Sequence, residues 1–326
     1  MKNRVLGKSG ISVSEVGLGC WQLGGDFGPI DRERASDVQR AAFDSGITFW
    51  DTADVYGNGE SERRIAEFVR ANGITPIIAT KVGRDGALYP DGYTKQKVRR
   101  NIEKSATRLG VEALDLVQLH CVPPEVLGAG DMIEWMEDFR RDGLIRAIGA
   151  SVETLDEARF AAAVPAITSL QIIFNIFRQD AIDELFPLAK ANDVGIIVRL
   201  PLASGVLSGR MTRDRQFAET DHRHYNRHGE AFSQGETFSG IPFETSIDLV
   251  EQMKPWVPSG MNMAQMSMRW VLDHPAVSTV IAGASRPEQA RENAAASDLA
   301  PLPDALHREL GEFYRQHVKS AITVPV

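Results

Sequence analysis

Residues 46–64, "GITFWDTADVYGNGESERR", contain the unit from which the fold is built. A short apolar run ends at Asp51, a polar loop follows that contains Tyr56, and an amphipathic segment begins after it. This order is typical of a buried strand followed by a helix. Aspartate and tyrosine are both costly to bury without partners. Their position after a strand therefore indicates chemistry whose other residues come from elsewhere in the chain.

The same order of strand and helix recurs along the chain. Eight short apolar runs lie at 13–21, 46–53, 76–83, 114–121, 145–152, 169–177, 195–202 and 278–285. Helix-like segments between them lie at 32–45, 60–72, 94–109, 131–142, 155–164, 180–192 and 262–273. One segment shows the pattern clearly, because Val98, Ile102 and Leu109 recur at helical spacing. Gly110 then provides a typical helix stop.

Eight strand–helix units in one series predict an α/β fold with a parallel sheet, either closed or doubly wound. Eight units favour closure into a (β/α)8 TIM barrel. A doubly wound dinucleotide fold would carry G-x-G-x-x-G, and "GLGCWQLGG" (17–25) has a different glycine spacing. No linker divides the chain, so we predict a single domain over residues 1–326. Before the first strand, Val5–Leu6 and Ile11–Val13 flank a glycine-bounded turn at Gly7–Gly10, which predicts a β-hairpin.

Composition excludes several classes of function. The chain has 326 residues, is 43% hydrophobic and has a formal net charge of -8. Lysine and arginine form no run, so the electrostatic footprint of a nucleic-acid-binding protein is missing. No apolar run reaches the length of a membrane span, and the first residues do not form a signal peptide. Two cysteines make no disulfide framework. We expect a reduced, cytoplasmic protein without nucleic-acid or membrane partners, and leave open whether it is a monomer or a homo-oligomer.

The ends of the predicted strands carry the candidate chemistry, because barrel active sites form at the C-terminal ends of the strands. The polar residues there are Asp51, Lys81, His120, Ser151, Gln171, Asn175 and Arg199, with Tyr56 in the loop after Asp51. A lysine cation lowers the pKa of a neighbouring tyrosine, and a carboxylate holds that lysine in place. A neutral histidine can donate a hydrogen bond to a carbonyl oxygen. Such a set can protonate a carbonyl group that accepts a hydride, and a positioned general acid contributes roughly 10²–10⁴ in rate. No side chain is redox-active, so the hydride has to come from a cofactor.

Five motifs occur in an order that is similar to one known family. They are "DTADVYG" (51–57), "ATKVG" (79–83), "DLVQLHCVPP" (115–124), "PLASGVLSGR" (201–210) and "GASRPEQARENAAA" (283–296). Through them the sequence resembles the aldo-keto reductase superfamily over nearly its whole length. The resemblance implies a TIM barrel whose bottom is closed by the N-terminal hairpin. It also implies NADPH/NADP+ as the cofactor and reversible reduction of a carbonyl substrate.

The resemblance assigns a role to each catalytic candidate. Tyr56 is expected to be the general acid and Lys81 to lower its pKa. Asp51 is expected to pair with Lys81, and His120 to orient the substrate carbonyl. The carboxamide of the nicotinamide is expected at Ser151 and Gln171, and the 2′-phosphate and adenine at Arg286, Gln289 and Asn293. The other expected cofactor contacts are Gly19, Trp21, Asp51, Arg199, Leu202, Ser204, Gly205, Leu207, Gly283 and Ser285. Arg286 also precedes a helix, whose N-terminus attracts phosphate.

Three positions depart from the family pattern. Val152 stands where the family often has asparagine, so one carboxamide contact is lost or made elsewhere. Arg199 stands where many members place an aromatic ring against the nicotinamide. Its flat guanidinium can stack there or meet an anionic substrate. Cys20 replaces a threonine whose contact is largely made by its backbone.

Two groups of residues suggest a metal site, and in both cases the sequence favours another interpretation. Cys20, His120 and Cys121 resemble a zinc ligand set. Adjacent strand residues point to opposite faces, so His120 and Cys121 should not share a cavity, and we expect both cysteines to be buried small residues. In the long polar stretch 208–243, His222, His224 and His228 alternate with arginines, which favours a solvated loop over a metal site. We expect this loop to fold over the cofactor or substrate mouth.

Several functions remain compatible with the sequence. The first is NADPH-dependent reduction of a small aldehyde, a dicarbonyl or a sugar-like carbonyl, and the polar mouth favours a polar substrate. The second is the same site working as a sugar or polyol dehydrogenase. The third is a cofactor-binding regulatory subunit without turnover. A barrel hydrolase with paired carboxylates is a fourth, but it leaves Lys81 without a role.

Overall fold

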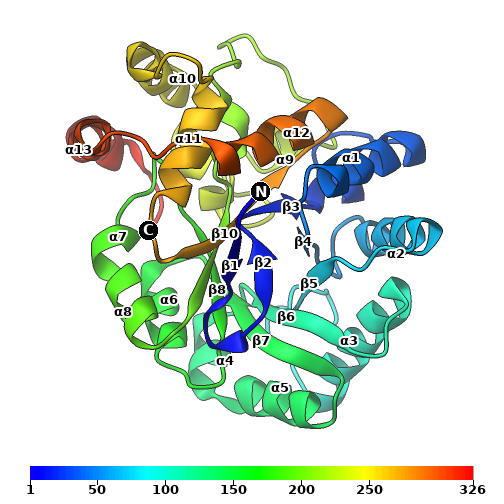
Figure 1. Ribbon diagram of the computed structural model, residues 1–326. Helices are drawn as coiled ribbons and strands as arrows, with labels where there is room; N and C mark the ends of the chain where they lie inside the picture. Colours follow the sequence, from blue (N-terminus) through cyan, green and yellow to red (C-terminus); the bar gives the residue numbers. More distant parts are fainter. Residues whose placement is uncertain (326) are drawn as a thin grey trace.

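Eight parallel strands close into a barrel in this computed structural model, which describes residues 1–325 (Figure 1). The barrel strands are β3 (Val16–Gly19), β4 (Phe49–Asp51), β5 (Ile77–Val82), β6 (Leu114–His120), β7 (Ile145–Ser151), β8 (Ser169–Ile173), β9 (Gly195–Arg199) and β10 (Val277–Gly283). Each strand pairs with the next in parallel, and β10 pairs with both β9 and β3. This closure confirms the predicted TIM barrel.

Helices surround the barrel on its outside (Figure 1). They are α1 (Arg32–Asp44), α2 (Glu60–Asn72), α3 (Lys95–Leu109), α4 (Pro124–Ala129), α5 (Asp131–Arg141), α6 (Leu155–Ala162), α7 (Ala181–Glu184), α8 (Phe186–Ala191), α9 (His222–Tyr225), α10 (Phe243–Met253), α11 (Met263–Leu272), α12 (Pro287–Ala295) and α13 (Asp304–Phe313). The bounds of α3 follow from local sequence. The side chain of Thr94 accepts a hydrogen bond from the Lys97 amide, and Gly110 ends the helix with a φ of 71°. No helix within residues 1–325 is long and apolar enough to cross a membrane.

Two predicted elements are divided in the structure. The run at 13–21 contains the end of hairpin strand β2 (Ser12–Ser14) and then barrel strand β3. The predicted helix at 180–192 is two short helices, α7 and α8, that meet at Leu185. Pro187 lies in the first turn of α8, where its missing amide proton is tolerated but would interrupt a continuous helix. Helices α4, α10 and α13 were not among the predicted segments.

The N-terminal hairpin closes the bottom of the barrel, as expected. Strand β1 (Asn3–Val5) pairs antiparallel with β2, and both cross the barrel end in Figure 1. Leu6 and Val13 insert into the barrel and are fully buried there. The apolar residues that they meet are Phe49, Ala79, Leu116, Ala147, Ile197 and Ile281. Gly7 has a φ of 49°, and a Cβ atom there would lie 2.3 Å from the amide nitrogen of Gly195.

The barrel interior changes from apolar to polar along each strand. Strand β4 contributes Phe49 to the apolar floor and Asp51 two residues later. Strand β5 contributes Ala79 and then Lys81 in the same way. Residues two apart face the same side of a strand. The polar residues of these strands therefore lie at the C-terminal mouth of the barrel, and the apolar floor lies at the other end.

Candidate active site

Lys81 lies at the centre of the polar mouth and joins two strands and a loop. Its Nζ atom is 2.5 Å from Oδ1 of Asp51, 2.8 Å from the Thr52 carbonyl oxygen and 3.2 Å from the Tyr56 hydroxyl. Both charged side chains are almost completely buried. Burial alone would lower the pKa of Lys81, but Asp51 and Tyr56 outweigh it, so the pKa is raised and the ammonium stays charged.

Tyr56 is a buried phenol beside this ammonium. Burial raises the pKa of Tyr56 to about 12, although Lys81 acts in the lowering direction that was expected. The hydroxyl therefore carries its proton at neutral pH, as a proton donor must. The Tyr56 ring also stacks on Trp21, with ring centroids 5.7 Å apart. This contact fixes the direction in which the hydroxyl points.

His120 ends strand β6 beside the tyrosine. Its ring centroid is 6.0 Å from that of Tyr56, and the two rings are nearly perpendicular. Burial, followed by the charges of Arg84 and Lys81, holds the pKa of His120 well below its usual value. The imidazole is thus neutral at pH 7. Its Nδ1 atom is buried and has no hydrogen-bond partner within residues 1–325.

A layer of amides lies beneath the charged pair. The second carboxylate oxygen of Asp51 accepts hydrogen bonds from Nε2 of Gln118 at 2.9 Å and of Gln171 at 2.7 Å. The hydroxyl of Ser151 donates to Oε1 of Gln171 at 3.4 Å. Gln118 was missed in the sequence, although a signal existed: it lies two residues before His120 on the same strand face.

A groove runs from the mouth toward helix α12. Its inner cavity, of about 240 Å³, is lined by the predicted residues Gly19, Trp21, Asp51, Gln171, Arg199, Leu202, Ser204, Gly205, Gly283, Ser285 and Gln289. Its outer cavity, of about 680 Å³, adds Arg286 and Asn293. Ser151 and Leu207 are buried and do not line either cavity. Ser151 contacts the groove through Gln171, and Leu207 packs in the hydrophobic core.

Gln22 lines both cavities and was not predicted. Its Oε1 atom is buried without a hydrogen-bond partner in the described part of the chain. A Cβ atom on Gly283 would lie 1.8 Å from its Nε2 atom, so a larger residue there would displace the amide end of Gln22. An unpaired buried amide in an elongated polar groove fits a bound ligand with polar groups, such as a dinucleotide.

A second cavity opens on the other side of Tyr56 and His120. It has a volume of about 320 Å³. Its walls include Trp21, Asp26, Arg84, Tyr89, Glu153, Tyr225, Phe232 and Glu236. We call it the smaller cavity because it is smaller than the groove as a whole. Tyr56 lines both this cavity and the groove, whereas Asp51 lines only the groove and His120 only this cavity. This is the arrangement that a reaction between a cofactor and a substrate needs.

Most of the chain matches one family. The model of the aldo/keto reductase family covers residues 15–315. The chain belongs to this family. The predictions of the family and of an oxidoreductase are therefore confirmed.

Three similar proteins illustrate the range of the family. The NADH-specific methylglyoxal reductase of Escherichia coli is 28% identical, and the match covers 96% of this chain and 99% of that protein. The structure of an aldo-keto reductase from Bacillus halodurans in its holo form has a TM-score of 0.76 at 26% identity, over 97% of this chain and 99% of that one. The glycerol dehydrogenase of Gluconobacter oxydans has a TM-score of 0.76 at 25% identity, over 94% and 93%.

The segment after β9, where the family has its cofactor-covering loop, has an unusual backbone. Leu200, Ala203 and Ser204 all have positive φ angles, which are rare outside glycine. The Ser204 hydroxyl donates to the carbonyl oxygen of Glu236 at 3.1 Å and accepts from the Phe238 amide at 3.1 Å. The segment is thus tied to the long stretch 208–243 over the mouth. Such strain is found where function requires a fixed loop shape.

The long stretch 208–243 is more ordered than its polarity indicated. It contains helix α9 and lines both the groove and the smaller cavity. The expectation of solvated histidines holds for His224 and His228 but is wrong for His222, which is fully buried. His222 packs against Trp21 and Phe27, at ring-centroid distances of 4.7 and 4.4 Å. Contacts with aromatic residues of another loop therefore bury His222, although the residues next to it in the sequence are polar.

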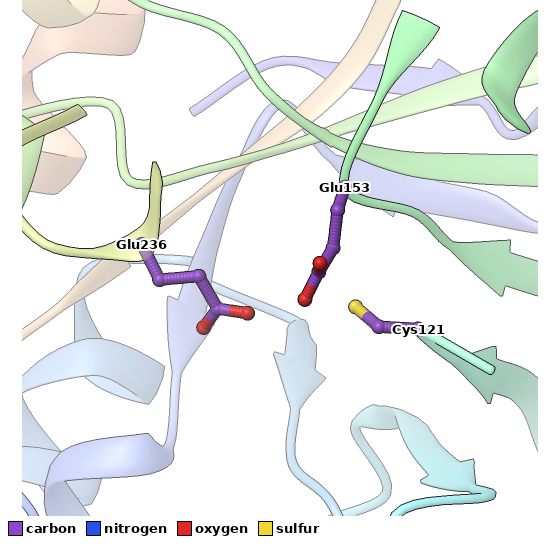
Figure 2. A group of neighbouring side chains, drawn as sticks. All are labelled: Cys121, Glu153 and Glu236. Carbon is purple, nitrogen blue, oxygen red and sulfur yellow. The ribbon is translucent and has the colours of Figure 1, made fainter. Parts of the chain in front are cut away.

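The cysteines are buried, as predicted, but the rule of strand alternation does not extend to Cys121. Strand β6 ends at His120, and Cys121 has a φ of 44°, so strand alternation no longer applies. Its sulfur and the carboxylates of Glu153 and Glu236 lie within 4.8 Å of one another (Figure 2). Among residues 1–325, this cluster contains neither Cys20 nor His120.

Arg199 is held at the end of β9 by two contacts. Its Nη2 atom donates to the carbonyl oxygen of Val152 at 3.0 Å, and its Nη1 atom is 3.6 Å from the Glu236 carboxylate. Two of the three departures from the family pattern, Val152 and Arg199, thus meet in one contact. The guanidinium lines the inner groove, and Glu236 neutralises its charge.

Proposed function

We propose that this protein catalyses the NADPH-dependent, reversible reduction of an aldehyde or ketone to the alcohol. The observation that carries the proposal is the contact of Lys81 with both Asp51 and the Tyr56 hydroxyl. The hydroxyl lies at the boundary between the groove and the smaller cavity, since Tyr56 lines both. A carbonyl in the smaller cavity would meet a cofactor from the groove at this point.

Each residue of the set has a separate task. A reduced nicotinamide held in the groove would supply the hydride that the carbonyl carbon accepts. Tyr56 gives its proton to the carbonyl oxygen, and Lys81 stabilises the phenolate that remains. Neutral His120 donates a hydrogen bond that orients and polarises the carbonyl. Asp51 keeps Lys81 charged and in place. In the reverse direction the phenolate accepts the proton of an alcohol.

NADPH is the proposed cofactor because the outer cavity is rich in arginine. Arg286 is the N-cap of α12, where the helix N-terminus already favours phosphate. Arg34, Arg210 and Arg215 line the same cavity, and Arg210 pairs with Glu292. The E. coli relative is NADH-specific by name, so both cofactors need to be compared. Arg286→Ala should weaken NADPH binding by about 10–100-fold, the loss expected for a hydrogen bond to a charged group, and leave NADH binding unchanged in fluorescence titrations. Equal weakening of both would place the 2′-phosphate elsewhere.

Oxidation of an alcohol is the one specific alternative to carbonyl reduction. The similarity to a glycerol dehydrogenase favours alcohol oxidation as a second candidate function, with the same residues in reversed roles. A small aldehyde, a dicarbonyl and a sugar-like carbonyl all remain candidate substrates. We also propose that residues 1–326 act as one domain, because strand β3 near the start of the chain pairs with strand β10 near its end. We propose the cytoplasm as its location, because both cysteines are free thiols.

The deciding experiment compares wild type with Tyr56→Phe. NADPH consumption is followed against small aldehydes, dicarbonyls and aldoses, and NADP+ reduction against glycerol and other polyols. Loss of the phenol should reduce turnover by about 10²–10⁴, while the dissociation constant for NADPH stays within about twofold. Turnover by Tyr56→Phe at the wild-type rate would refute Tyr56 as the acid. Tight NADPH binding without any turnover would favour a regulatory subunit instead.

A further inference from the structure

The walls of the smaller cavity carry an ion-pair cluster that takes no direct part in the proposed transfer of hydride and proton. Arg84 pairs with Glu153 and also with Glu236, at 3.2 Å from the latter. Arg199 adds a second contact to Glu236 at 3.6 Å. The carboxylates of Glu153 and Glu236 converge in Figure 2. The two arginine charges and the two glutamate charges cancel, so the cluster is neutral overall.

The cluster comes from four separate parts of the barrel mouth. Arg84 follows strand β5, Glu153 follows β7, and Arg199 ends β9. Glu236 comes from the long stretch 208–243. Its side chain is only 10% exposed, and that of Arg84 only 17%. Water screens these charges weakly, so their mutual attraction is stronger than at the surface.

Glu153 and Glu236 pair with the arginine donors that would otherwise bind an anion. A guanidinium offers a planar fork of donors that suits carboxylates and phosphates. In this cavity, Glu153 and Glu236 already accept from Arg84. Burial alone would raise the pKa of Glu236, but Arg199 and Arg84 outweigh it, so the pKa is lowered and the carboxylate stays ionised. Asp26, a third carboxylate, also lines the cavity.

We propose that this cluster makes the cavity selective for uncharged, hydroxylated carbonyl substrates and excludes those that carry a carboxylate or phosphate. An anion that enters has to break an ion pair or lie unpaired beside carboxylates, and both are unfavourable. Hydroxyl groups, in contrast, can donate to the remaining carboxylate oxygens. Trp21, Tyr225 and Phe232 provide apolar ring surface for the carbon chain of the substrate. The inference rests on the proposed carbonyl reduction, and it names Glu153 and Glu236 as the specificity-determining residues.

The first arm of the test compares D-glyceraldehyde with D-glyceraldehyde 3-phosphate. Wild type should show a kcat/KM at least tenfold higher for the uncharged aldehyde. Glu236→Gln and Glu153→Gln keep the side-chain shape but leave one arginine charge of the cluster without a balancing carboxylate. The ratio should therefore fall by about 10–100-fold, as expected for gained charge-assisted hydrogen bonds. Glu134→Gln changes an exposed glutamate of α5 in the same way. It is the matched control and should keep the wild-type ratio. An unchanged ratio in both cavity variants overturns the proposal.

The second arm needs no turnover and separates this inference from the proposed function. Succinate is titrated calorimetrically into the protein saturated with NADP+. Wild type and Glu134→Gln should bind it at least tenfold more weakly than Glu236→Gln or Glu153→Gln. Equal succinate binding in all four proteins overturns the inference even if carbonyls are reduced. If no carbonyl is reduced but the affinities differ as expected, the proposed reaction fails and the charge selectivity of the cavity stands. Glu153, whose side chain is 28% exposed, provides a second variant should Glu236→Gln fail to fold.

Discussion

The floor and the mouth of the barrel are built from the same strands but have opposite properties. The floor combines Leu6 and Val13 of the hairpin with Leu116 and other apolar barrel residues. The mouth, two residues further along the strands, holds Lys81 and Gln118 in a polar network. Two strand residues span about 7 Å. A single step of the alternation therefore separates the part that stabilises the barrel from the part that carries chemistry.

The energetic balance differs between the two regions. Each apolar side chain in the floor gains roughly 1.5–3 kcal/mol from burial. The buried pair of Lys81 and Asp51 recovers little more than the desolvation of its two charges, so it adds little net stability. Breaking the pair is a different matter, because the remaining charge stays buried without a partner. The comparison predicts that mouth variants disturb catalysis most and that floor variants disturb only stability.

The largest effect is expected for Lys81→Met. Turnover should fall by about 10²–10⁴, because the phenolate of Tyr56 loses its stabilising cation. The free energy of unfolding in urea should fall by about 3–5 kcal/mol, because Asp51 is left as an unpaired buried charge. A double variant that adds Asp51→Asn should recover most of the stability and none of the turnover. A double variant as unstable as the single one would show that the charge of Asp51 is not the cause.

A floor variant should show the reverse pattern. Leu116 is fully buried in the apolar cluster, and Leu116→Ala should lower the free energy of unfolding by about 2–5 kcal/mol. The kcat/KM of the folded enzyme should stay within about twofold of wild type, since Leu116 belongs to the apolar floor and not to the hydrogen-bonded network of the mouth. Leu116→Met preserves most of the volume and is the control, with a loss under about 1.5 kcal/mol. A large fall in kcat/KM for Leu116→Ala alone would show that floor and mouth are coupled.

The smallest predicted effect is on the pH dependence of stability. It tests whether the stretch 208–243, which lies over the mouth, excludes water as the floor does. Burial lowers the pKa of His222 to about 4, partly offset by Asp221, whereas an unfolded histidine titrates near 6.5. The unfolded chain therefore binds a proton that the folded chain does not. Stability from this group is complete above about pH 6.5 and falls as the pH drops toward 4.

Replacing the ring should remove this loss. Between pH 7 and pH 4.5 the unfolding free energy of His222→Phe should fall by about 2–3 kcal/mol less than that of wild type. His224→Phe replaces an exposed ring of the same helix and is the control. Both are measured by urea unfolding at the two pH values. Identical pH dependence in wild type and His222→Phe would mean that the pKa of His222 is the same in the folded and the unfolded chain.

Much of the fold could be predicted from local patterns. The eight strands, the principal helices and the hairpin follow from the spacing of apolar residues and from stop signals such as Gly110. The bounds of α3 differ from the prediction by a single residue at its N-terminus. The break between α7 and α8 carried a signal in Pro187 that the apolar pattern obscured. The boundary between β2 and β3 had no such signal, because a hairpin strand and a barrel strand are equally apolar.

Chemistry and position along the strands were enough to predict Asp51, Tyr56, Lys81 and His120 as one set, since residues at the C-terminal ends of barrel strands must converge. Only the tertiary structure decided the environment of that set. The burial of His222 and the position of Cys121 beside Glu153 depend on contacts between segments far apart in the chain. Their energies come from partners that no local pattern specifies. For the same physical reason, the proposed substrate selectivity could be inferred only after the fold had brought the charges together.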